Sequence, residues 1–176
     1  MVDKKNDINA IKFIDVIKYV LIYMKWCNYF FIFFFIASLL LLYIKVNIIL
    51  YTLTYLLGGI LSISIHEYMH ILFIKKITNN SHIRIKINSN HFSIIPCDKV
   101  HGYKSILIAC SGPIVCFLIA VFLYLIKQWL SLESFFMDLL IFSYACHIFS
   151  ILPFFKDGSM ILKEVIYYLL KGGEKQ

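Results

Sequence analysis

The chain has 176 residues, of which 61% are hydrophobic, 17% are aromatic and only 15% are charged. Soluble domains carry about 25% charged residues, so this composition excludes an ordinary soluble domain and favours a polytopic membrane protein. The formal net charge is +7, but the positive residues gather at the ends of apolar runs. That placement argues against nucleic-acid binding and indicates membrane topology and contact with anionic lipid head groups.

The first 26 residues differ from the rest of the chain. Met1–Asp7 is polar, and we expect it to be frayed. Ile8–Met24 mixes apolar residues with Lys12, Asp15 and Lys18, a pattern typical of an amphipathic helix that lies on a membrane surface. We therefore divide the chain into an interfacial segment at 1–26, a single transmembrane domain at 27–171 and a tail at 172–176.

Four apolar runs are long enough to be membrane-spanning helices, at about 27–44, 50–74, 105–126 and 135–155. At about 1.5 Å per residue even the shortest run covers roughly 27 Å, close to the thickness of a hydrocarbon core. The Gly58-Gly59 pair in the second run would let another helix approach closely. Ser111-Gly112-Pro113 in the third run would interrupt the helical hydrogen bonds and allow a similar approach.

The connection between the second and third runs has a different pattern. Ser81–Asn90 reads Ser-His-Ile-Arg-Ile-Lys-Ile-Asn-Ser-Asn, and His91–Pro96 follows it. Polar and apolar residues alternate there with period two, and an Asn-Ser-Asn turn follows, which favours a β-hairpin. The predicted fold class is thus an all-α polytopic membrane protein with about four transmembrane helices and one small hairpin.

Lysine and arginine predict the orientation. They are concentrated before the first run, between the second and third runs, and after the fourth, whereas the other side carries only Lys45 and Lys127. Because cytoplasmic loops are enriched in these residues, both termini are predicted to be cytoplasmic in a multi-pass protein of the cell membrane. The five cysteines form no Cys-x-x-Cys pair, and we interpret them as small buried hydrophobic residues.

The strongest chemical signal is His66-Glu67-Tyr68-Met69-His70, inside the second apolar run. Two histidines four residues apart share one face of a helix and can bind one Zn²⁺, and Glu67 beside them can take a proton from water as a general base. Ionisable side chains at membrane depth cost free energy, so they mark a functional site by default. We predict one zinc ion per chain, held in part by His66 and His70.

A catalytic zinc site has three protein ligands and one open position. Asp157 is the preferred third ligand, because it follows the helix break at Pro153, lies on the same side of the membrane as the histidines and precedes Gly158. A helix N-cap is the structural alternative for this aspartate. His147, which we expect to lie too far toward the opposite face, is the next candidate, and Asp98 is a weaker one.

Four features in this order resemble the site-2 protease family of intramembrane zinc metalloproteases. They are the His-Glu-x-x-His turn in a span, a β-hairpin, Ser111-Gly112-Pro113 early in the next span, and Pro153 followed by Asp157-Gly158. The resemblance covers roughly residues 50–162. It implies His66, His70 and Asp157 as zinc ligands and Glu67 as the catalytic base. It also implies that the hairpin and the Gly-Pro segment guide an unwound substrate strand, from a single-span membrane protein or a hydrophobic peptide.

The sequence departs from this family in the polar groups around the metal turn. The family usually has asparagine at the positions of Cys116 and Ser150, and here Asp157 follows Pro153 one residue early, with Lys156 in place of an apolar neighbour. These departures favour an alternative function, a non-catalytic membrane accessory protein of peptide export or immunity that keeps the protease fold. A metal-ion transporter fits less well, because a single ligand cluster without further acidic residues provides no path for ions across the membrane.

Overall fold

The computed structural model describes residues 2–40, 51–78, 82–88, 91–97, 99–131 and 134–170. In chain order its elements are β1 (Val2–Asp7), α1 (Phe13–Tyr23), α2 (Lys25–Leu40), the π-helix η1 (Tyr55–Leu61), α4 (Ser62–Ile77), β2 (His82–Asn88), β3 (His91–Pro96), α5 (Tyr103–Trp129), α6 (Phe135–Ala145), the 3₁₀-helix η2 (Cys146–Ile151) and α7 (Lys156–Leu170). The protein is mostly helical, as predicted, and the hairpin is present as β2 and β3.

Within the described residues, three helical runs are long and apolar enough to cross a membrane: Tyr51–Ile77, Tyr103–Trp129 and Phe135–Leu170. They contain the predicted second, third and fourth spans. The predicted first span, 27–44, begins in α2, but its last residues lie outside the described part of the chain. The run Tyr103–Trp129 is one continuous helix that contains Pro113, so the helix continues through Ser111-Gly112-Pro113 although Pro113 has no N–H to donate to it.

Val2–Asp7 form a strand of a sheet, so the expectation that these residues are frayed is wrong; Met1 lies outside the described residues. β1 pairs antiparallel with β2, which pairs antiparallel with β3, so the described strands form one sheet in the order β1-β2-β3. The physical reason is that a two-stranded hairpin leaves the outer edge of β2 with unpaired N–H and C=O groups. β1 satisfies that edge along its whole length, from Val2 opposite Ile87 to Asp7 opposite His82.

The alternation in β2 places its isoleucines on one face. Ile83, Ile85 and Ile87 are buried and Arg84 is exposed, because successive side chains in a strand point to opposite faces. The buried face belongs to one apolar cluster with α1 and α4 residues, which are Val16, Val20, Ile71 and Ile74. The sheet is thereby attached to α1 and to the C-terminal half of α4.

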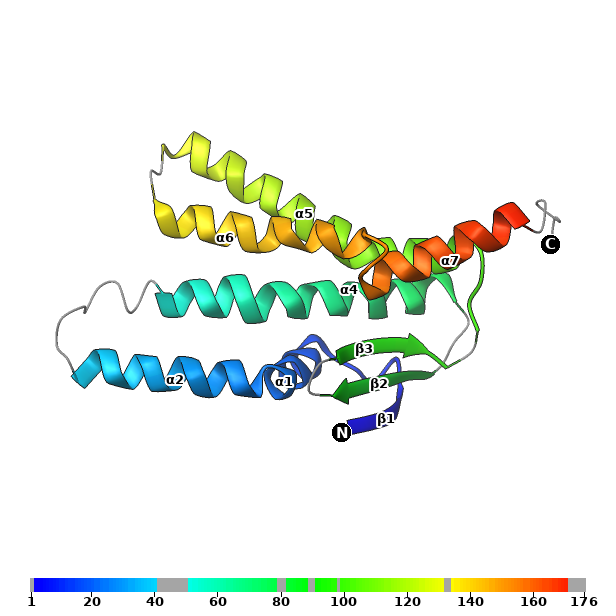
Figure 1. Ribbon diagram of the computed structural model, residues 1–176, viewed down its shortest axis with the longest axis horizontal. Helices are drawn as coiled ribbons and strands as arrows, with labels where there is room; N and C mark the ends of the chain where they lie inside the picture. The colour runs from blue at the N-terminus through cyan, green and yellow to red at the C-terminus, as the bar shows by residue number, and fades with distance from the viewer. Residues whose placement is uncertain are drawn as a thin grey trace.

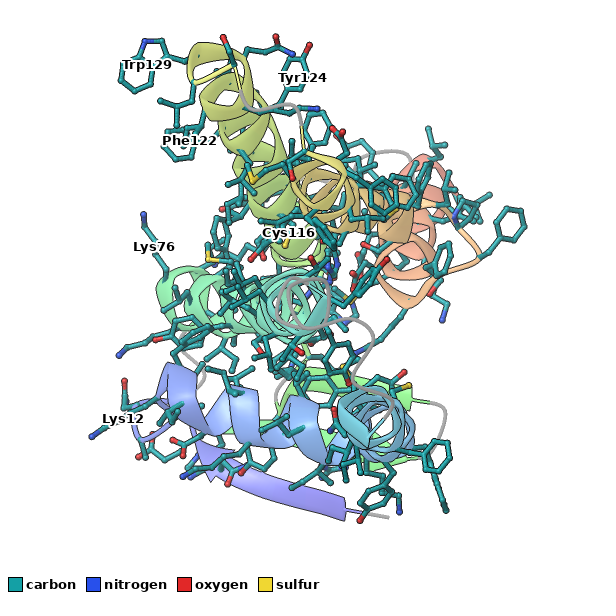
Figure 2. The ribbon with its side chains drawn as sticks, turned by 90° about the vertical axis from the view of Figure 1, so that its left-hand side faces the viewer. Lys12, Lys76, Cys116, Phe122, Tyr124 and Trp129 are labelled. Carbon is teal, nitrogen blue, oxygen red and sulfur yellow. The ribbon has the colours of Figure 1, made fainter. Side chains whose placement is uncertain are left out.

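α4 is the central element of the molecule. It packs against α5 and α1 and also contacts β3, while α5 in turn packs against α6, η2 and α7. In Figure 1, α5, α6 and α7 lie on one side of α4, and α2 and the sheet lie on the other. Figure 2 shows Phe122, Tyr124 and Trp129 of α5 projecting outward, and all three side chains are exposed. Large apolar side chains on the outside are typical of a surface that faces lipid.

Gly58 confirms the predicted close approach between helices. A Cβ atom at this position would lie 2.6 Å from Ser143 Oγ of α6, so a larger residue would require the Ser143 side chain to move. Gly58 belongs to η1, directly before α4. π-Helical turns are rare and occur frequently at functional sites.

The sheet core yields a stability prediction. Ile85→Ala removes a fully buried side chain, and we expect it to lower the free energy of unfolding by about 2–5 kcal/mol through lost burial and the cavity left behind. Ile95→Ala, in the neighbouring strand, is the matched control, because Ile95 is 37% exposed. Thermal unfolding in detergent, followed by circular dichroism, measures both. Equal losses in the two variants would contradict the buried face assigned to β2.

Candidate metal centre

His66 and His70 lie on the buried face of α4, and each is only 6% exposed. Residues four apart on an α-helix lie one above the other, so the two rings meet edge to face with centroids 4.8 Å apart. Ser62 and Ser64 are buried on the same helix and bond back to carbonyls one turn earlier. The serines thus satisfy their own hydroxyl groups and leave the imidazoles available for other partners.

Asp157 reaches this pair from the first turn of α7. The chain turns at 152–155 before α7 begins, and Gly158 follows the aspartate. A Cβ atom on Gly158 would overlap the carbonyl groups of Ile151 and Leu152, so this tight turn requires glycine. The turn brings the Asp157 carboxylate, 14% exposed, to the two histidines. The sequence expectation that the glycine lets the aspartate face inward is confirmed.

Three donor atoms converge at one point. Asp157 Oδ2 lies 3.1 Å from His66 Nε2 and 3.6 Å from His70 Nε2, and the two Nε2 atoms are 3.2 Å apart. Zinc ligands at about 2.0–2.1 Å in a tetrahedron lie about 3.3 Å from one another. The three separations therefore match three corners of a tetrahedral zinc site, and two imidazoles with one carboxylate are a donor set that zinc accepts. This group can hold a metal ion.

The ring orientation of His70 is fixed from its far side. His70 Nδ1 lies 2.7 Å from the carbonyl oxygen of Ile108 in α5, so the ring donates its Nδ1 hydrogen there. Ser111 Oγ also donates to this carbonyl, at 2.7 Å. A histidine that donates its other N–H to a backbone carbonyl is held in the tautomer that leaves Nε2 free to bind a metal. The contact thus prepares His70 Nε2 as a ligand.

Gly112 forms the wall of the centre on the α5 side. A Cβ atom there would lie 2.8 Å from the carbonyl oxygen of His66 and 2.9 Å from His70 Nε2. The close approach predicted for Ser111-Gly112-Pro113 is therefore confirmed, although the helix is not interrupted. Without a side chain at this position, α5 packs directly against the turn of α4 that carries both histidines.

Glu67 is half-buried and follows His66 directly in the sequence. Its negative charge acts on His70 and on Lys156, and the charge of Asp157 acts on the same lysine. Lys156 precedes Asp157 and its side chain is exposed. One free carboxylate, one lysine and the three donors thus lie within electrostatic range of one another.

Asp98 and His147 were the alternative candidates for the third ligand. Asp98 lies outside the described residues. His147 does not lie too far away, as the sequence analysis expected, because its ring centroid is 4.9 Å from that of His66. The expectation is wrong because the chain turns at 152–155, between His147 and Asp157, and does not continue as one straight helix. Both His147 and Asp157 consequently reach α4.

The structure also adds groups that the sequence analysis missed. The Ile108 carbonyl oxygen holds His70, and no pattern of residue types reports a backbone contact of this kind. Cys116 is fully buried and Ser150 has a buried hydroxyl without a hydrogen-bond partner among the described residues. Sequence analysis had already named these two positions, where the family usually has asparagine, but not their burial.

Comparisons of the chain with protein-family models, with characterised proteins and with solved structures found no match. The functional conclusions below therefore depend on the residues and geometry of this chain.

The close packing at Gly112 predicts that alanine destabilises the protein more at this position than at Gly59. We expect Gly112→Ala to lower the free energy of unfolding by about 1–3 kcal/mol, because the new methyl group overpacks against α4. Gly59→Ala is the matched control, since its Cβ would meet only Tyr55 at 3.6 Å, and alanine is favoured over glycine in helices by about 1 kcal/mol. Thermal unfolding of both variants tests this. Equal tolerance of the two alanines would contradict the close packing at Gly112.

Proposed function

We propose that this protein is an intramembrane zinc metalloprotease that hydrolyses a peptide bond in a membrane-embedded or hydrophobic peptide. The observation that carries the proposal is the convergence of His66 Nε2, His70 Nε2 and Asp157 Oδ2 among helices long and apolar enough to cross a membrane. Three ionisable groups in such surroundings cost free energy unless they are paired or bind a metal. The resemblance to site-2 proteases supports the same assignment.

The ion would be held by His66, His70 and Asp157. When bound, zinc supplies a Lewis acid for the substrate carbonyl and lowers the pKa of water to about 7. Glu67, next to His66 in sequence and half-buried, accepts the proton from the attacking water and later returns it to the leaving amine. Lys156, which lies within range of Glu67 and Asp157, supplies a positive charge that balances these two carboxylates.

The substrate must present an unpaired peptide bond to these groups. A membrane-spanning helix satisfies its N–H and C=O groups internally, so the substrate has to unwind locally before cleavage. β3 is an outer strand of the sheet, and it contacts α1 and α4, the helix that carries the His-Glu-x-x-His turn. We propose that this sheet holds the unwound strand and that the Gly112-Pro113 segment helps to guide it, as the resembling family implies. Lipid and a hydrophobic peptide are the partners, in a multi-pass cell-membrane protein with cytoplasmic termini.

The test of the catalytic role is Glu67→Gln. We expect this variant to keep its zinc, because Glu67 is not among the three ligands, and to lose peptide cleavage by about 10²–10⁴-fold, the usual contribution of a general base. The assay follows cleavage of synthetic single-span peptides in vesicles that contain the zinc-loaded protein. Glu164→Gln is the matched control, because Glu164 accepts a hydrogen bond from Gly102 N far along α7, and it should cleave at the wild-type rate.

A Glu67→Gln variant that cleaves as fast as the wild type would contradict the assignment of the base. If zinc-loaded wild type cleaves no peptide, the accessory-protein alternative is favoured. The specific observation behind that alternative is that Cys116 and Ser150 occupy the positions at which the resembling family has asparagine.

The need for local unwinding yields a second prediction, on the substrate. We expect peptides with a Gly-Pro pair in the centre of the span to be cleaved, and otherwise identical peptides with Leu-Leu there to resist cleavage, because the leucine helix keeps its hydrogen bonds. Mass spectrometry of the products measures both the rate and the position. Equal cleavage of both peptides would exclude unwinding as the selective step.

A further inference from the structure

A second group of metal-binding side chains adjoins the candidate metal centre. His66, Cys116 and His147 offer ligand atoms that all lie within 4.8 Å of one another. They come from three elements, α4, α5 and η2, that are distant in sequence and meet in the interior. His66 belongs to this group and also to the group formed with His70 and Asp157, so the two groups share one ligand.

The contacts within this second group are close. The His147 ring is tilted by 31° against the His66 ring, and His147 Nε2 lies 3.2 Å from Ser62 Oγ. Cys116 Sγ lies 3.6 Å from the carbonyl oxygen of Ser62. Ser62 is one helical turn before His66, so Cys116 and His147 both lie along the same face of α4. Figure 2 shows Cys116 in the interior, between α5 and α4.

The polar atoms of this second group have few hydrogen-bond partners among the described residues. The Cys116 side chain is fully buried, but its only hydrogen bond among the described residues is the weak one to Ser62. His66 Nδ1 is also buried and has no hydrogen-bond partner in the described part of the chain. A buried polar atom without a partner costs free energy, because its hydration is lost and nothing replaces it. A ligand that binds here would satisfy what the protein alone leaves unsatisfied.

We propose that His66, Cys116 and His147 form a second metal site, which takes a thiophilic divalent ion such as Zn²⁺, Cd²⁺ or Co²⁺. One thiolate and two imidazoles are ligands that such ions prefer, and the sulfur makes this site softer than the oxygen-containing site at Asp157. When the ion binds while the first group is empty, the Cys116 thiol releases its proton to solvent and becomes a thiolate, with no change in oxidation state. If ions occupy both groups at once, the shared His66 ring also releases its N–H proton to solvent. The site goes beyond the proposed proteolysis, because its sulfur is not among the groups assigned to that reaction.

Co²⁺ is the probe for the experiment, because a thiolate bound to it produces a charge-transfer band in the near ultraviolet. The full chain in detergent is titrated with CoCl₂ as wild type and as Asp157→Ala, which disables the first group and leaves the second intact. We expect the thiolate band in both proteins. Cys116→Ser should abolish the band, and Cys110→Ser, a matched change on the same helix, should keep it.

His147→Ala provides an independent variant that keeps the thiol. We expect it to weaken Co²⁺ binding, followed by the thiolate band, by more than about tenfold, since loss of an outer-shell partner of a ligand alone costs about 10–100-fold. Absence of the band from folded wild type and Asp157→Ala, or its persistence in Cys116→Ser, would overturn the proposal. These readouts do not depend on peptide cleavage, so a failure of the protease assignment is distinguishable from a failure of the second site.

Discussion

The contact between one carboxylate and two imidazoles on the central helix is the interaction on which the rest of the structure depends. Asp157, His66 and His70 are largely removed from water, in a chain whose surface is mostly apolar. Polar groups in such surroundings are stable only when each has a partner. The elements around α4 are therefore arranged to bring those partners to within 3.1–3.6 Å.

Two glycines and one carbonyl group make this arrangement possible. Gly112 lets α5 approach the metal turn, and Gly158 lets the chain turn so that Asp157 reaches it. The carbonyl oxygen of Ile108 orients His70. A side chain at either glycine would displace a helix, and a rotated His70 would move its Nε2 atom away. The convergence of three donors is thus a property of helix packing and not of the His-Glu-x-x-His turn alone.

Much of this could be predicted from the sequence, and the reasons for the rest are physical. The spacing of the two histidines is that of one helical turn, and the isoleucines alternate with the period of a strand. Both patterns are local, so the sequence alone predicts the His-Glu-x-x-His turn and the hairpin. Asp157 was recognisable because Pro153 and Gly158 mark a break in an apolar run. The pairing of β1 with β2 was missed, because a polar strand has no apolar pattern and is held by backbone hydrogen bonds. The position of His147 was wrong because the turn at 152–155 separates it from Asp157, so ten residues do not correspond to one straight helix.

The central claim is that His66, His70 and Asp157 together hold one zinc ion. The most direct measurement is the metal content of the purified protein in a Cys116→Ser background, where the thiolate of the second group is absent. The account predicts about one zinc per chain in Cys116→Ser, and its loss when Asp157→Ala is added to the same background. Zinc that remains in the double variant, or a well-folded Cys116→Ser protein that takes up no zinc, would contradict the account.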